Sequence, residues 1–331
     1  METLPDQFTD ALTRVEVNGT KRARAIAAHL EVRALLETSS RLCEWGVDTA
    51  LIGSYARNTG VYPGNDVDVF TKLTKLDTEA SPARVFGLVC DLLTSHYGDR
   101  AEPRARSVKI AFSDDGFSID VVPAVHAGEQ WAIPAHEREA WGGSDGRWVV
   151  TDPERLAELT TEANKQLQVN GRGAYVPVVK LMRQARKHHR GDAKPGGLYI
   201  ELATYDAFSN GVAGDSFAEL FAAALSAVAG RLQTAGAVPL IDPALGTAYQ
   251  PAPDPADLAS TASLFSRLAD LAAQALRADR CQAAVLWRQI LGSNDRGAVF
   301  PLPPGCDETG NVIPAVTANR GRGSNEARGF G

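Results

Sequence analysis

The chain has 331 residues, of which 44% are hydrophobic and 22% charged, and its net charge at pH 7 is −6. This composition excludes an intrinsically disordered protein and is sufficient for two lobes, each with its own core. No apolar run approaches the ~20 residues that span a bilayer, and the acidic segment 1–10 does not resemble a signal peptide. The negative net charge argues against sequence-independent binding to duplex nucleic acid. We therefore expect a cytoplasmic protein without membrane contacts.

The first 150 residues predict an α/β lobe that begins with a helix. Residues 7–45 are rich in Ala, Leu, Arg and Glu, and we expect them to be mostly helical with an interruption at Gly19. Asp114-Asp115-Gly116 is typical of a hairpin turn. The other elements predicted in this part are a helix over 83–96 and strands over 49–52, 66–72, 107–112 and 117–122.

After residue 150 the pattern becomes mainly helical. Asp152 followed by Pro153 is typical of a helix start, with Asp as N-cap and Pro at the first helical position. Apolar residues at helical spacing predict helices over 154–170, 174–190, 198–209, 215–234, 256–279 and 281–291. Pro251, Pro253 and Pro255 predict a stiff connector between two of these helices.

These patterns predict an α+β fold with three segments. Residues 1–150 hold an N-terminal helix and a mixed-sheet lobe, and residues 151–300 hold a mainly helical lobe. Residues 301–331 form an extended segment whose end, Ala318 to Gly331, is rich in Gly and Arg and predicts a flexible tail.

The four cysteines lie far apart in the sequence, at positions 43, 90, 281 and 306. None forms a CxxC pair or lies near a histidine cluster, so the spacing indicates neither a zinc ribbon nor a disulfide framework. We expect free or buried thiols.

Asp66 and Asp68 are the first candidates for chemistry. They alternate with apolar residues in Asp66-Val67-Asp68-Val69-Phe70, so they should lie on one face of a half-buried strand. Two carboxylates on one face repel each other unless a counter-charge lies between them. A divalent metal supplies that charge, and Mg²⁺ prefers oxygen ligands completed by a phosphate. The pair therefore indicates metal-dependent chemistry on a nucleotide.

Asp120 is a third acid in an apolar run, Phe117-Ser118-Ile119-Asp120-Val121-Val122. If this run pairs with the strand of Asp66 and Asp68, three carboxylates converge and can hold two Mg²⁺ ions about 3.5–4 Å apart. The alternative for Asp120 alone is a strand-end acid bonded to backbone N–H groups.

Gly53 and Ser54 end a predicted strand at a turn into a short helix. Glycine permits close approach of the backbone to a phosphate, and the serine hydroxyl adds a donor. An ordinary tight turn is the alternative. The Gly-Ser pair indicates a phosphate site only in combination with the aspartates that follow it.

Together these motifs resemble the DNA-polymerase-β-type nucleotidyltransferase superfamily. The run Gly53-Ser54-Tyr55-Ala56-Arg57-Asn58-Thr59, the pair Asp66-Val67-Asp68 and the distant Asp120 are most similar to oligoadenylate synthases, cyclic GMP–AMP synthase and their bacterial relatives. Those relatives are the cGAS/DncV-like nucleotidyltransferases (CD-NTases) of anti-phage cyclic-oligonucleotide signalling (CBASS). The similarity covers roughly residues 45–300.

The resemblance assigns roles in the helical half. Val178-Val179-Lys180-Leu181-Met182 is similar to the family helix whose lysine contacts the donor triphosphate, and Tyr199-Ile200-Glu201-Leu202 to the segment that follows it. Trp287-Arg288-Gln289-Ile290-Leu291-Gly292 is similar to the closing helix. Many relatives carry a phosphate-binding serine where this chain has Gly196 and Gly197. Backbone amides would have to replace it.

Other side chains of this region are assigned from their spacing. Lys180 is surrounded by apolar residues and should point inward, whereas Arg183, Lys187 and Arg190 follow helical spacing and predict a solvated positive face. His188 and His189 are interpreted as surface residues rather than metal ligands. For stacking on the donor base, Tyr199 and Tyr205 are the candidates, with core packing as the alternative for each.

The resemblance implies a Mg²⁺-dependent enzyme that condenses NTPs, ATP or GTP among them, into a cyclic di- or trinucleotide and releases pyrophosphate. Two Mg²⁺ ions, which Mn²⁺ could replace, would be bound by Asp66, Asp68 and Asp120, and Gly53, Ser54 and Lys180 would hold the phosphates. The alternatives are an RNA- or tRNA-tailing nucleotidyltransferase, a linear 2′–5′ oligonucleotide synthase and a catalytically silent nucleotide-binding scaffold.

Two statements about partners also follow from the resemblance. The family's zinc-containing DNA sensor is absent from the sequence, so no duplex-DNA activator is implied. Some bacterial relatives are attached through their C-terminal residue to targets by ubiquitin-like conjugation enzymes, and Gly331 would suit such a reaction.

Overall fold

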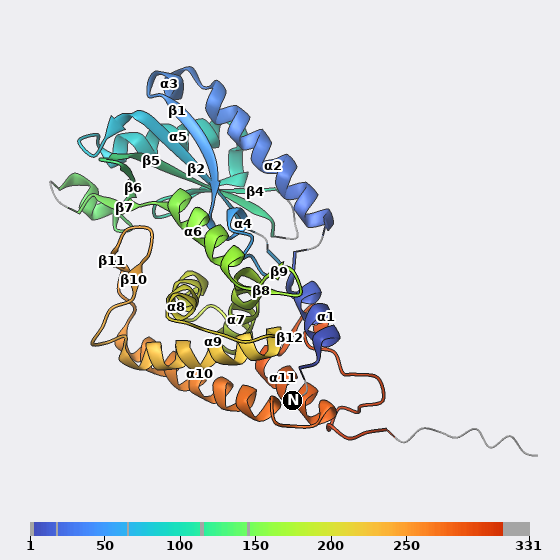
Figure 1. Ribbon diagram of the computed structural model, residues 1–331. Helices are drawn as coiled ribbons and strands as arrows, with labels where there is room; N and C mark the ends of the chain where they lie inside the picture. The colour runs from blue at the N-terminus through green and yellow to red at the C-terminus, as the bar shows by residue number, and fades with distance from the viewer. Residues whose placement is uncertain (1–2, 18, 65, 113–115, 144–145, 314–331) are drawn as a thin grey trace, which may run out of the picture.

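The computed structural model describes residues 3–17, 19–64, 66–112, 116–143 and 146–313. The two largest hydrophobic cores of these residues belong to a sheet-containing lobe and to a helical lobe, which lie one above the other in Figure 1. The predicted α+β, two-lobed fold is therefore confirmed. None of the described helices is long and apolar enough to cross a membrane.

A mixed sheet forms the centre of the first lobe. In the described chain its main path runs β1-β2-β5-β4-β3, and β6 and β7 extend it from β5. β2 and β5 are parallel, and the other neighbours are antiparallel. The strands are β1 (Val47–Ile52), β2 (Asp66–Asp77), β3 (Ala101–Pro103), β4 (Val108–Ala111), β5 (Ser118–Ala127), β6 (Gln130–Pro134) and β7 (Trp148–Thr151). Asp114 and Asp115 of the predicted hairpin lie outside the described residues.

Helices pack on this sheet through apolar side chains such as Val32, Leu36, Phe86 and Val89. They are α2 (Gly19–Thr38), α3 (Ser40–Glu44) and α5 (Pro82–Tyr97), with the short 3₁₀ turns η1 (Gly98–Arg100) and η2 (Arg138–Gly142). The hydroxyl of Ser81 caps α5 by accepting a hydrogen bond from the backbone N–H of Arg84.

The helix predicted over 7–45 is interrupted more strongly than the sequence indicated. It consists of α1 (Pro5–Val15), α2 and α3. After α1 the carbonyl of Val15 accepts the backbone N–H of Tyr62 at 2.8 Å instead of continuing the helix. α1 packs through Phe8 and Leu12 in the core of the helical lobe, across the expected boundary at residue 150.

The second lobe contains α6 to α11 around a core of leucine, alanine and aromatic side chains. Asp152 caps α6 as predicted, with its carboxylate accepting the backbone N–H of Arg155 at 2.9 Å. The helices are α6 (Pro153–Gln166), α7 (Tyr175–Arg190), α8 (Gly197–Ser209), α9 (Phe217–Thr234), α10 (Pro255–Ala275) and α11 (Arg280–Leu291). Three two-stranded hairpins complete it: β8 (Gln168–Val169) with β9 (Arg172–Gly173), β10 (Ile241–Asp242) with β11 (Thr247–Ala248), and β12 (Ser293–Asn294) with β13 (Gly297–Ala298).

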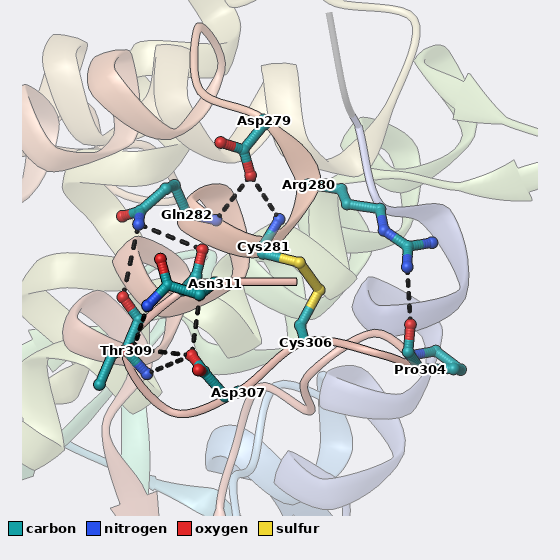
Figure 2. Close-up of a disulfide and its surroundings, with 10 residues drawn as sticks. Asp279, Arg280, Cys281, Gln282, Pro304, Cys306, Asp307, Thr309 and Asn311 are labelled. Atoms are coloured by element: carbon teal, nitrogen blue, oxygen red, sulfur yellow. Dashed lines mark hydrogen bonds between the residues drawn. A yellow bond between two sulfur atoms is a disulfide. The ribbon is translucent and has the colours of Figure 1, made fainter. Parts of the chain in front are cut away.

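The expectation of four free or buried thiols is wrong for two of them. Cys281 and Cys306 form a disulfide, with their Cα atoms 5.3 Å apart, while Cys43 and Cys90 are free. Figure 2 shows how the segment after α11 returns past the first turn of that helix, where the guanidinium of Arg280 donates to the carbonyl of Pro304 at 2.7 Å. This tertiary return, rather than any local cysteine spacing, brings the sulfurs together.

Loss of this disulfide should destabilise the helical lobe. The bond closes a segment with a sequence separation of 25 residues, and a loop of that size is worth about 3 kcal/mol of unfolding free energy. We expect a lower melting temperature for Cys281→Ser, or for the wild type in reductant. Calorimetry measures the melting temperature. The control is Cys43→Ser, which removes a free thiol and keeps the disulfide, so reductant should lower its melting temperature as it does that of the wild type. Equal melting temperatures with and without reductant would contradict the assignment.

Candidate active site

Gly53 occupies a position that only glycine fits. It begins the short helix α4 (Gly53–Ala56), directly after β1, and its φ is +70°. Ile52, the last residue of β1, pairs with Asp68 of β2, so the backbone turn passes directly beside that carboxylate. A Cβ at residue 53 would overlap an oxygen of Asp68. The turn of Gly53 and Ser54 therefore packs closely against β2, the strand that carries Asp68.

The two acid-bearing strands are neighbours, which meets the condition that the sequence analysis left open. β2 and β5 run parallel, and Asp68 stands directly opposite Asp120 in their register. Asp66, two residues earlier on β2, shares the face of Asp68. The hydroxyl of Ser118 donates to Asp66 at 2.8 Å, and that of Ser107 donates to Asp120 at 3.0 Å.

Burial, together with repulsion between the carboxylates, raises the pKa values of Asp68 and Asp120. Burial, reinforced by the charges of Asp120 and Asp66, raises the pKa of Asp68 to about 7. Burial also raises the pKa of Asp120, and the hydrogen bond from Ser107 opposes that shift. A cation placed among the three would remove the repulsion. Their all-oxygen donor set fits a hard divalent ion.

The carboxylates are not yet gathered around one point. Within the described ranges, no three Asp, Glu, His or Cys side chains are arranged to hold an ion together. Asp66 and Asp120 are each turned toward a serine hydroxyl instead. Each serine hydroxyl bonds one oxygen of its carboxylate, so the second oxygen of Asp66 and of Asp120 is left as a ligand for a metal ion.

Two cavities flank the strand of the aspartates. One, of about 270 Å³, has a lining that includes Ser54, Asp66, Arg183, Lys187 and Gly197. The other, also about 270 Å³, contains Asp68 and Asp120 together with Arg106, Ser107 and apolar side chains that include Phe70 and Val122. Reacting groups could therefore approach the aspartates from two sides.

Lys180 lies near the Gly-Ser turn but already has a partner. Its ammonium donates to Glu16 at 2.9 Å, and the residue is only 4% exposed, which agrees with the inward orientation expected from the sequence. It lines a smaller cavity, of about 140 Å³, together with Ser54, Asn58 and Gly60. The ion pair with Glu16 would have to open before Lys180 could bind a phosphate.

Tyr199 faces the core of the helical lobe. It is 3% exposed and packs edge-on against Tyr249, with ring centroids 5.4 Å apart. Tyr205 packs on Tyr175 in the same way, at 6.0 Å. Core packing, the alternative in the sequence analysis, is the arrangement of both. His189 bonds the end of α11 through the carbonyls of Gln289 and Ile290, both at 3.1 Å.

Sequence reasoning missed a buried ionic cluster between the lobes. Glu201 of α8 accepts hydrogen bonds from Arg57 at 2.6 and 3.3 Å, from Thr59 at 3.0 Å and from Arg183 at 3.0 Å. The interpretation of Arg183 as part of a solvated face is therefore wrong, because its side chain is only 18% exposed. The missed signal was an acid in an apolar helix, Tyr199-Ile200-Glu201-Leu202, which requires a buried partner.

Comparison with known proteins places this geometry in a family. Residues 1–164 match the model described as the Second Messenger Oligonucleotide or Dinucleotide Synthetase domain. The chain is 30% identical over 310 residues, 88% of its length, to a cyclic AMP-AMP-AMP synthase of an Acinetobacter strain, and the match covers 85% of that protein.

Solved structures share the fold at low identity. The Escherichia coli CdnC structure with ATP has a TM-score of 0.70 and 18% identity, over 91% of this chain and all of that one. The Bradyrhizobium diazoefficiens CdnG complex with GTP has a TM-score of 0.65 and 13% identity, over 82% and 92% of the two chains. The E. coli DncV structure with 3′-deoxy GTP has a TM-score of 0.64 and 13% identity, over 85% and 92%.

These similarities favour the cyclic product over RNA tailing, and the presence of all three aspartates agrees with an active enzyme. The relative that carries the argument aligns with most of both chains, so the relationship extends through both lobes and is not confined to the catalytic motif. The chain therefore belongs to the second messenger oligonucleotide or dinucleotide synthetases, the nucleotidyltransferases that condense nucleoside triphosphates into cyclic oligonucleotides for bacterial anti-phage signalling.

Proposed function

We propose that this enzyme joins ATP into a cyclic trinucleotide at the face of β2 that carries Asp66 and Asp68. The main support is the register of Asp68 against Asp120, which puts three carboxylates on adjoining strand positions. The choice of ATP and of three units is supported by the relative whose name specifies that product.

Asp66, Asp68 and Asp120 would hold the metal. Enzymes of this family generally use divalent metal ions, and we propose two Mg²⁺ ions, replaceable by Mn²⁺. When bound, the metal lowers the pKa of the attacking hydroxyl and neutralises charge on the phosphates. The protein's own contribution is to fix the carboxylates on paired strands, so that few conformations are lost on binding.

The donor nucleotide would occupy the cavity of Ser54 and Asp66. There the hydroxyl of Ser54 and the guanidinium of Arg183 offer hydrogen-bond donors to its phosphates, and the backbone of Gly53 precedes Ser54 at the start of α4. Gly197 lines the same cavity at the first turn of α8, where backbone N–H groups replace the serine of other family members. Lys180 would join only after leaving Glu16, and no stacking role is proposed for Tyr199.

The acceptor would enter through the cavity of Asp68 and Asp120. Its hydroxyl oxygen forms a bond to the α-phosphorus of the donor, and the bond from that phosphorus to the bridging oxygen breaks, releasing pyrophosphate. Arg106 lines this cavity and forms no hydrogen bond or ion pair with the described residues, so its charge is free for an acceptor phosphate. Two further transfers, the last one intramolecular, would close the ring.

Product analysis tests this function. The purified protein is incubated with ATP, with each other NTP and with the four-NTP mixture, in Mg²⁺ or Mn²⁺, and the products are treated with phosphatase and weighed by mass spectrometry. We expect one resistant product with the mass of three AMP units less three waters. Long phosphatase-sensitive chains would contradict cyclisation, and a resistant dinucleotide would contradict the number of units.

Attachment of the chain to a target through Gly331, which lies outside the described residues, is a separate proposal.

A further inference from the structure

The buried carboxylate of Glu201 holds together elements from both lobes. Arg57 and Thr59 follow α4, the helix that begins with Gly53 and Ser54, whereas Arg183 lies on α7 and Glu201 on α8. Glu201 is 1% exposed and Arg57 7% exposed, so water does not compete for these contacts. Arg183 also donates to the hydroxyl of Thr59 at 3.3 Å, which closes the cluster.

The charge of this cluster does not balance. Within the cluster two guanidiniums surround one carboxylate, which leaves one positive charge in a largely buried position, and outside the cluster the carboxylate of Asp68 acts on both guanidiniums. An unbalanced buried charge is costly unless an anion approaches it. Arg183 lines the cavity of Ser54 and Asp66, so the surplus charge lies where the phosphates of a donor nucleotide are proposed to bind.

Orientation matters as much as charge. A guanidinium has five N–H donors in a fixed plane, and those of Arg183 that bond Glu201 and Thr59 fix the direction of the rest. Arg57 likewise ties Glu201 to α4, because its backbone N–H donates to the carbonyl of Gly53 at 3.3 Å. Glu201 thus contacts both Arg183 and Arg57 without lining the described cavities itself.

We propose that Glu201 is a positioning residue for nucleotide binding, which aligns the guanidinium of Arg183 on the phosphates of the donor. The inference rests on the proposed function for the location of those phosphates. It extends that function by assigning the contact between the lobes a role in phosphate recognition rather than in stability alone.

Equilibrium binding of ATP and of adenosine tests the proposal. With a non-hydrolysable ATP analogue and Mg²⁺ in a calorimeter, Glu201→Gln should weaken ATP binding by at least about 10-fold, the usual effect of a charge-assisted contact. Adenosine binding should be unchanged, since adenosine has no phosphate. The matched control is Asp206→Asn on the same helix, which loses an ion pair to Arg231 outside the cleft and should bind both as the wild type does.

A double variant tests whether Glu201 acts through Arg183. If it does, Glu201→Gln combined with Arg183→Met should weaken ATP binding little more than Arg183→Met does alone. A further 10-fold loss in the double variant would overturn the proposal, as would equal losses of ATP and adenosine binding in Glu201→Gln. These assays need no turnover, so they stand even if the product is not the one proposed above.

Thr59→Val provides the test if Glu201→Gln does not fold. Valine has nearly the shape of threonine but lacks the hydroxyl that donates to Glu201 and accepts from Arg183. We expect a loss of ATP affinity of about 3-fold with unchanged adenosine binding. Wild-type affinity for ATP in a folded Thr59→Val protein would count against a positioning role for the cluster.

Discussion

Replacing Asp68 with asparagine should abolish product formation and, at the same time, stabilise the metal-free protein at pH 8. Asparagine keeps the shape of the side chain but loses the negative charge that a divalent ion requires, so turnover should fall by at least about 100-fold. The stability gain has a separate cause. Burial and the charges of Asp120 and Asp66 raise the pKa of Asp68 to about 7, so its ionised form is strained in the folded state.

The direction of the pH dependence follows from this shift. In the unfolded chain the pKa of an aspartate is about 3.9, so between pH 4 and pH 7 the folded protein binds more protons than the unfolded one. The unfolding free energy of the metal-free wild type should therefore fall as the pH rises through this range. Asparagine removes the fall, which amounts to roughly 2–4 kcal/mol at pH 8.

Melting temperatures in EDTA at pH 5 and pH 8 measure this effect. The difference between Asp68→Asn and the wild type should be small at pH 5 and large at pH 8. Asp91→Asn serves as the control because its carboxylate is exposed on α5. Equal stability of Asp68→Asn and the wild type at pH 8, or a variant that still makes product from ATP and Mg²⁺, would contradict the assignment of Asp68.

The catalytic strands could be predicted from sequence because their signals are local. Alternation of polar and apolar residues around Asp68 and Asp120 identifies half-buried strands, and an acid in such a strand requires a partner. Helix starts were predicted for the same reason, since the cap at Asp152 depends only on its neighbours. What alternation does not give is which strands pair, and the pairing of β2 with β5 came from the structure.

The residues that sequence reasoning missed make contacts between distant parts of the chain. Arg57 and Glu201 are separated by 144 positions, and no local pattern reports a partner so far away. A basic helix also suggests exposure, yet Arg183 is half-buried because Glu201 compensates its charge. The same reason explains the disulfide, because Cys281 and Cys306 meet only after the chain has returned past α11.

Truncating Trp287 should strongly destabilise the helical lobe. The side chain is fully buried on α11 and contacts Phe8 of α1 and Phe221 of α9, with ring centroids 5.1 and 5.8 Å apart. Trp287→Ala removes these contacts and leaves a cavity, which costs about 3–5 kcal/mol of unfolding free energy. Denaturant titration followed by circular dichroism measures the loss.

Trp287→Phe separates packing from hydrogen bonding. The indole N–H of Trp287 has no hydrogen-bond partner among the described residues, so its removal costs nothing, and phenylalanine keeps an aromatic contact with Phe8. We therefore expect this variant to lose less than half of what alanine loses. Trp45→Ala, at a partly buried site in the other lobe, should cost less than about 2 kcal/mol. An equal loss of unfolding free energy in Trp287→Ala and Trp45→Ala would contradict the core that α1 and α11 share. The position of the N-terminal helix would then not depend on the helical lobe.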